Sequence, residues 1–213
     1  VIADIKPVAE IQQKLGVPIE VSTFIGSSQI RAYTEDWDVA TMLEHSRAAL
    51  AFAEKENLAV MFVTEDTTRA HPRILEALYG AALENPATKR LCFCDTVGHA
   101  IPQGTVNLIH WAVELVKKSG RDDVKIDWHG HMDRGLGVPN SIAALQAGAH
   151  RVHGTALGIG ERAGNTSLEE VIMALHTRQN LMPFDTGIQT QHIYSTSRLV
   201  SMITGIMVQP NKA

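Results

Sequence analysis

The residues with the clearest chemical potential are His129 and His131, which lie two positions apart at the end of a β-like run. Residues i and i+2 of a strand point to the same face of a sheet. Two neutral imidazoles on one face provide half of a divalent-metal site, where an ion polarises a carbonyl or enolate oxygen as a Lewis acid. The alternative interpretation is a pair of surface histidines beside an acidic turn.

A second polar loop, residues 158–165 with the sequence GIGERAGN, follows another strand-like run and contains Asn165. Two such loops on one rim favour the metal interpretation. The same loop also fits a G-x-G-x-x-G/A dinucleotide fingerprint, with Asp185 about 20 residues further on, and so supports a rival hypothesis of an NAD-dependent oxidoreductase. We rank this rival lower because the fingerprint normally opens the first βαβ unit, and because Glu161 would bring a carboxylate close to a pyrophosphate.

The elements that must position these loops are short β-rich runs that alternate with helical patterns. Such alternation is typical of βαβ units in a parallel sheet. The strand starts lie roughly 25 to 40 residues apart, and an eight-stranded barrel at that spacing needs about 250 residues. The predicted strands are residues 19–24, 59–65, 90–96, 125–131 and 151–157, with a weaker run at 181–184.

We therefore predict an α/β protein with a (β/α)₈ TIM-barrel fold that is incomplete in this chain. The first predicted element is a helix, and Val1 is not an initiator methionine, so we expect the first strand or strands to lie upstream. Residues 1–213 are interpreted as one partial catalytic barrel domain, with no second domain in the chain.

Local signals predict where several helices begin and end. Asp38 is expected to cap one helix, Pro72 to open another, and Asn140 to cap a short helix that runs to Gly148. A further helix is expected to end at Gly120, after two lysines that face the negative end of its dipole.

In barrels of this kind the chemistry sits at the carboxyl ends of the strands. Polar residues follow each predicted strand, among them Glu65 after the second and Thr96 after the third. Together with the two histidines and Asn165 they predict a site formed by a carboxylate, a hydroxyl, two imidazoles and an amide. Glu65 has an alternative interpretation as the partner of Arg69, four residues further on.

Composition excludes several classes of function. The net charge is −4, and no block of lysine and arginine is present to meet phosphates, so we expect no nucleic-acid partner. The sequence has no hydrophobic signal segment or apolar run of membrane-spanning length, and just two cysteines, which predicts a cytoplasmic protein without a membrane partner. Cys92 and Cys94 are interpreted as buried small apolar side chains, because no second cysteine pair completes a thiolate site.

Several segments together resemble the family of 2-isopropylmalate and homocitrate synthases, barrel metalloenzymes that also include citramalate synthase and hydroxymethylglutaryl-CoA lyase. These segments are residues 22–25 (STFI), 65–69 (EDTTR), 95–98 (DTVG), 129–135 (HGHMDRG) and 158–170 (GIGERAGNTSLEE). The resemblance implies that His129, His131 and Asn165 hold a divalent cation, Mn²⁺ or Mg²⁺ first and Zn²⁺ as another possibility. An aspartate ligand and a catalytic arginine are implied upstream of Val1.

The resemblance further implies an acyltransferase that condenses acetyl-CoA with a 2-oxo acid and then hydrolyses the thioester. Glu65 matches the acid/base carboxylate of the family, and Thr96 matches the residue that binds the carboxylate of the oxo acid. The expected oxo acid is 2-oxoisovalerate, giving 2-isopropylmalate for leucine biosynthesis by a homodimer. Homocitrate synthase, citramalate synthase and a lyase-like enzyme remain alternatives, as does an inactive partial-barrel scaffold. We expect the chain by itself to be inactive.

Overall fold

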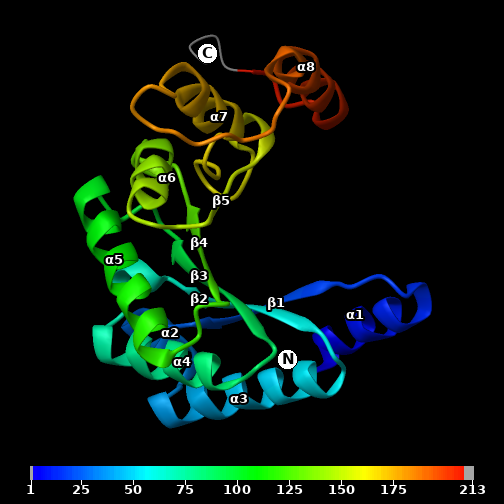
Figure 1. Cartoon of the computed structure of the whole chain (residues 1–213), viewed down its shortest axis with the longest axis vertical. Coiled ribbons are helices and arrows are strands. Elements are labelled where there is room, and N and C mark those ends of the chain that lie inside the picture. Colours follow the sequence, from blue (N-terminus) through cyan, green and yellow to red (C-terminus); the bar gives the residue numbers. More distant parts are fainter. Residues whose placement is uncertain (1, 209–213) are drawn as a thin grey trace.

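The computed structural model of the chain describes residues 2–208, which form a parallel sheet flanked by helices (Figure 1). The strands follow the order β1-β2-β3-β4-β5, so every neighbour in the sheet is also the next strand in the sequence. This order is that of a singly wound barrel, because doubly wound sheets reverse direction at a switch point. The strands are β1 (Glu20–Gly26), β2 (Ala59–Glu65), β3 (Thr88–Asp95), β4 (Lys125–Gly130) and β5 (Arg151–His153).

Helices connect these strands and cover one face of the sheet, with α3, α4 and α5 along it in Figure 1. Within residues 2–208 the loops contain three 3₁₀ turns, at Thr67–Arg69, Ala156–Gly158 and Thr190–His192. The helices are α1 (Ile2–Leu15), α2 (Gln29–Glu35), α3 (Val39–Lys55), α4 (Pro72–Glu84), α5 (Pro102–Ser119), α6 (Gly137–Gln146), α7 (Leu168–Thr177) and α8 (Ile193–Thr204).

Alternation along each strand separates an apolar face from a functional face. Phe62, Phe93 and Trp128 are fully buried and pack in the main core beneath the helices. The side chains at the intervening positions of each strand point to the opposite face, where Phe24 of β1 is 70% exposed. Because the period of a strand is two, the chemistry-bearing residues at alternate positions share the face away from the helices.

Several predicted element boundaries are confirmed. Asp38 caps α3 by accepting a hydrogen bond from the Thr41 amide, at 2.7 Å. Pro72 is the first residue of α4, and Gly120 ends α5 in the left-handed conformation. These boundaries were predictable because capping is a local interaction.

Three sequence expectations are wrong. Residues 181–184 form no strand, since Pro183 lacks an amide donor for a sheet and Met182 packs against α7 instead. The fifth predicted strand, residues 151–157, ends at His153, and a 3₁₀ turn at Ala156–Gly158 follows it. Asn140 is not a cap: it is buried inside α6 and donates to the carbonyl oxygen of Ala100, at 3.0 Å.

No helix among residues 2–208 is both long and apolar enough to cross a membrane. The predicted domain boundary at residues 1 and 213 lies outside the described residues.

Candidate metal centre and active site

The two histidines of the H-x-H segment face each other at the carboxyl end of β4. Their Nε2 atoms are 3.2 Å apart. Two metal–nitrogen bonds of about 2.1 Å at an angle of 90° to 110° separate the nitrogens by about 3.0 to 3.4 Å. The imidazole pair therefore already has the spacing of neighbouring ligands around one cation.

Both imidazoles are held in the neutral form that binds metals. Burial, reinforced by the neighbouring rings of His153 and His131, lowers the pKa of His129 to about 4. Burial and the charge of Arg162 lower the pKa of His131 against the opposing effect of nearby carboxylates. Since a protonated imidazole has no lone pair at either ring nitrogen, these shifts leave each ring with one lone pair for a cation at neutral pH.

Asn165 pairs with His131 along the backbone because its loop folds back onto the end of β4. Residues His131 and Asn165 form an antiparallel bridge, and the Met132 amide donates to the Gly164 carbonyl oxygen at 2.9 Å. The side-chain amide of Asn165 donates to Ile159, at 3.2 Å. Its Oδ1 is buried and has no hydrogen-bond partner among the described residues, which is the state expected of an oxygen ligand.

The donor set of two imidazoles and one amide oxygen fits a divalent cation. No group of three or more His, Cys, Asp or Glu side chains within residues 2–208 is arranged to hold a metal ion. The amide oxygen of Asn165 is therefore needed to give this candidate centre its third donor.

Glu65 ends β2 and is directed to the same cavity as the histidines. Its side chain is 31% exposed, and the guanidinium of Arg31 lies 3.7 Å from its Oε2. The alternative that Glu65 pairs with Arg69 is wrong, because Arg69 makes a two-pronged ion pair with Asp66 instead, at 2.8 and 2.7 Å. Glu65 therefore keeps a carboxylate that faces the site.

Thr96 follows β3, and its backbone and side chain are both engaged in the neighbouring loops. Its Oγ1 accepts a hydrogen bond from the Asp66 amide at 2.8 Å, which leaves the hydroxyl proton free to be donated. Its carbonyl oxygen accepts from Arg162, whose guanidinium also pairs with Asp133 at 2.7 Å. Arg162 thus ties the loop of Asn165 to the loops that follow β3 and β4.

Glu65, Thr96, His129 and His131 line one cavity of about 470 Å³, so the structure brings four of the five predicted site residues together. The fifth, Asn165, adjoins this cavity through its pairing with His131. Phe24 and Met61 add apolar wall to the same space. An apolar cavity with a few convergent polar groups is typical of a small-molecule site.

A charge network beneath the histidines was missed from the sequence. Asp127 of β4 is fully buried and meets Arg90 at 3.0 Å, Arg151 at 2.6 Å and His153 at 3.3 Å. The ring of His153 in turn lies 5.6 Å from that of His129, centroid to centroid. The signal was present, because Asp127, His129 and His131 occupy alternate positions of the predicted strand 125–131, and alternate positions of a strand share a face.

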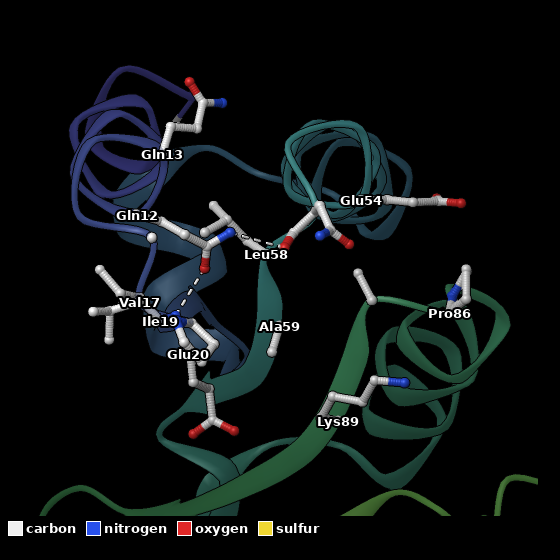
Figure 2. A pocket seen from close by; sticks show the side chains of 14 residues that line it. Gln12, Gln13, Val17, Ile19, Glu20, Glu54, Leu58, Ala59, Pro86 and Lys89 are labelled. Carbon is white, nitrogen blue, oxygen red and sulfur yellow. Dashed lines mark hydrogen bonds between the residues drawn. The ribbon is translucent and has the colours of Figure 1, made fainter.

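A larger cavity, about 800 Å³, lies at the amino ends of β1, β2 and β3, away from the histidines. Figure 2 shows that Gln12 joins two sides of this cavity by hydrogen bonds. Its side chain donates to the Asn57 carbonyl oxygen at 3.0 Å and accepts from the Ile19 amide at 2.8 Å. No histidine or cysteine lines this cavity. Because barrel chemistry occurs at the carboxyl ends of strands, we place the candidate site at the smaller cavity.

The dinucleotide-fingerprint interpretation of residues 158–163 is not supported by the loop geometry. The helix α7 begins at Leu168, so the glycines do not form its first turn. A side chain at Gly160 would collide with the backbone amide of Asn165, at 2.9 Å. The glycines therefore make room for Asn165 rather than for a pyrophosphate.

A singly wound sheet with a neutral imidazole pair at its carboxyl end places the chain among TIM-barrel proteins with a candidate cation site. The chain belongs to the HMGL-like family, whose family model matches residues 3–200. The predicted TIM-barrel class is thereby confirmed.

Curated relatives agree with the resemblance. The chain is 44% identical over 194 residues to a 2-isopropylmalate synthase of Carboxydothermus hydrogenoformans, covering 91% of this chain and 38% of that protein. It is 39% identical over 208 residues to a putative (R)-citramalate synthase of Methanosarcina acetivorans, covering 94% of this chain and 41% of that protein. The chain thus spans about two fifths of the length of these relatives.

Solved structures show the same fold. The HMG-CoA lyase of Bacillus subtilis superposes with a TM-score of 0.75 at 20% identity, covering 95% of this chain and 69% of that one. An HMG-CoA lyase of Acinetobacter baumannii, solved in complex with coenzyme A and 3-methylmalate, gives 0.75 at 18% identity, covering 92% and 65%. At these identities the likeness establishes the fold alone.

Proposed function

We propose that the chain forms part of the catalytic barrel of a divalent-metal-dependent acyltransferase, which condenses acetyl-CoA with a small 2-oxo acid. The observation that carries this proposal is the neutral His129 and His131 pair, 3.2 Å apart at the carboxyl end of β4. The oxo acid proposed first is 2-oxoisovalerate, giving 2-isopropylmalate for leucine biosynthesis. Relatives named 2-isopropylmalate synthase, at 44% and 40% identity, support that choice.

His129, His131 and Asn165 would hold the cation, with Mn²⁺ or Mg²⁺ proposed first and Zn²⁺ as the alternative. The amide oxygen favours a hard ion, whereas imidazoles also suit Zn²⁺. When bound, the cation supplies Lewis-acid polarisation of the carbonyl group of the oxo acid.

Side chains of this chain carry the remaining steps of the proposed reaction. The Thr96 hydroxyl donates a hydrogen bond to the carboxylate of the substrate, and this bond orients the oxo acid in the cavity. Glu65 takes a proton from the methyl group of acetyl-CoA, and the methyl carbon attacks the oxo carbon. The π electrons of the carbonyl group pass to its oxygen, which then takes up a proton to become the hydroxyl of the product. Hydrolysis of the thioester then releases CoA and makes the condensation effectively irreversible.

Citramalate synthesis from pyruvate is the second candidate. It is favoured by two Methanosarcina relatives, at 39% and 45% identity, that are named putative (R)-citramalate synthases. Pyruvate and 2-oxoisovalerate differ by two methyl groups, and one methylene is worth about 1 to 3 kcal/mol in an apolar pocket. The apolar wall formed by Phe24 and Met61 is the part of this cavity that would sense that difference.

The proposal is tested by CoA release in the complete gene product that contains this chain, with acetyl-CoA, Mn²⁺ and a panel of 2-oxo acids. We expect release with 2-oxoisovalerate that is abolished by chelation and by His129→Ala, whereas the exposed His99→Ala retains it. Release with pyruvate alone would favour the second candidate. Release that is insensitive to chelation, or no release with any oxo acid, would contradict the proposal.

The cytoplasmic location, the homodimer and the inactivity of the chain by itself stay predictions, as does its description as one partial catalytic domain. Gel filtration with light scattering of the complete gene product tests the homodimer.

A further inference from the structure

Two cysteines, the only ones in the sequence, lie on the functional face of β3 beside the histidines. Cys92 and Cys94 are two residues apart, so both side chains point away from the helices. Cys94 is in register with His129 on the neighbouring strand β4. Both thiols are free, and both line the cavity of about 470 Å³ that also holds His129 and His131.

The two thiols interact with each other in a mainly apolar setting. They pack with Val63 and Met61 in a small cluster of their own, with exposures of 1% for Cys92 and 6% for Cys94. A hydrogen bond with Cys94, followed by burial, raises the pKa of the Cys92 thiol well above its usual range. The Cys92 thiol therefore stays protonated and uncharged at neutral pH.

Backbone geometry disfavours closing this pair into a disulfide. Two steps along an extended strand separate the Cα atoms by about 6.6 Å. Side chains at these two positions point in the same direction, so their Cβ atoms are about equally far apart, whereas a disulfide needs Cβ atoms about 3.5 to 4.5 Å apart. An additional atom between the two sulfurs removes this mismatch, so the strand presents the pair as a chelating dithiol.

We propose that Cys92 and Cys94 form a binding site for thiophilic trivalent arsenic within the cavity. A monosubstituted arsenical, R–As=O, condenses with two thiols to give R–As(S-Cys)₂ and one water, and arsenic stays trivalent throughout. Two As–S bonds form, two S–H bonds break, and both protons leave on the oxygen as water. The product is uncharged, which suits the apolar cluster.

An arsenical fits this pair better than a divalent metal ion does. Thiolate centres for metals use three or four ligands, and within the described residues no group of three His, Cys, Asp or Glu side chains is arranged to hold a metal ion. His153 approaches Cys92, with its Nδ1 3.9 Å from the sulfur, but already engages Asp127 through its Nε2 at 3.3 Å. A ligand that needs two sulfurs alone is satisfied here.

The test titrates the complete gene product with phenylarsine oxide, then denatures it and maps free thiols and arsenical adducts on peptides that contain Cys92 and Cys94. We expect one adduct at this pair, with both of its thiols lost together. The adduct should survive excess 2-mercaptoethanol and be removed by 2,3-dimercaptopropanol, because chelation by two sulfurs raises apparent affinity by about 10²- to 10⁴-fold.

Variants separate the thiols from their surroundings. Cys92→Ser and Cys94→Ser should each weaken binding by about 100-fold or more, whereas Val63→Ala loosens the same cluster and should retain the stoichiometric adduct. Circular dichroism checks that each variant is folded. If a variant does not fold, the adduct and thiol measurements on the wild-type protein still test the proposal. No adduct on the wild-type chain, or removal by the monothiol, would overturn the proposal.

Inhibition is a consequence that rests on the proposed function. An adduct at Cys94 would occupy space beside His129, and so CoA release by the complete gene product should fall in parallel with adduct formation. If the adduct forms in a protein that never releases CoA, the proposed function fails and the dithiol site stands. If CoA release occurs and no adduct forms, the dithiol site alone fails.

Discussion

The buried charge network of Asp127 gives the sharpest test of how this barrel sheet is held together. Asp127 is fully buried between Arg90 and Arg151, and Glu20 of β1 contacts both arginines at 3.2 and 3.1 Å. The network therefore links β1, β3, β4 and β5 across the functional face. Replacing Asp127 by Asn leaves two guanidinium groups facing a neutral amide.

The expected cost follows from burial. Removing one partner of a buried ion pair costs about 3 to 5 kcal/mol. Since the side chains of Arg90 and Arg151 are 26% and 39% exposed, water and Glu20 compensate in part. We therefore expect Asp127→Asn to lower the free energy of unfolding by about 3 kcal/mol, and the control Glu20→Gln, at the more exposed end, by about 0.5 to 1 kcal/mol.

Urea unfolding at pH 7, followed by far-ultraviolet circular dichroism, measures both variants. With a slope of about 3 kcal/mol per molar urea, the midpoint of Asp127→Asn should fall by about 1 M. If the two variants have the same midpoint, the carboxylate at Asp127 is not the centre of the network and the reasoning is refuted.

Acid provides a second measurement of the same carboxylate. Burial by itself raises the pKa of Asp127, but hydrogen bonds from His153 and Arg151 and the charges of Arg151 and Arg90 outweigh it, so the pKa is lowered from 3.8. A carboxyl group with a lowered pKa stabilises the fold above its unfolded pKa and loses this contribution as pH falls through the folded pKa. The wild type should therefore lose more stability than Asp127→Asn between about pH 5 and pH 3.

Two further variants, each with a matched control, test the metal site and the packing beneath it. Gly160→Ala places a methyl group against Asn165 and should weaken Mn²⁺ binding about 10- to 100-fold by calorimetry, whereas Gly80→Ala, with open space around it, should bind normally. Unchanged affinity in Gly160→Ala would contradict Asn165 as a ligand. Tyr79→Phe removes hydrogen bonds to Thr64 and the Cys92 carbonyl and should cost about 1 to 2 kcal/mol in thermal unfolding. Tyr33 is 90% exposed, so the control Tyr33→Phe should change the free energy of unfolding by less than about 0.5 kcal/mol.

The sequence by itself determined the parallel α/β architecture and the identity of the residues at the strand ends. Strand periodicity and helix capping are local properties, so the starts of β2, β4 and β5 and the cap at Asp38 were predictable. The spacing of His129 and His131 fixed their common face before any packing was known. A site built from the ends of successive parallel strands could thus be predicted from strand order alone.

Tertiary structure decided what depends on distant partners. Asn140 has the chemistry of a cap, and only the packing of α6 against the loop after β3 makes it a buried donor to Ala100. The pairing of Arg69 with Asp66 frees Glu65 for the cavity, and the fold of residues 158–165 delivers Asn165 to His131. Cys92 and Cys94 look like ordinary core residues in the sequence, and their place beside the histidines depends on the register between β3 and β4. The contacts of Asn140 with Ala100 and of Asn165 with His131 join residues more than 30 positions apart, so no local pattern encodes them.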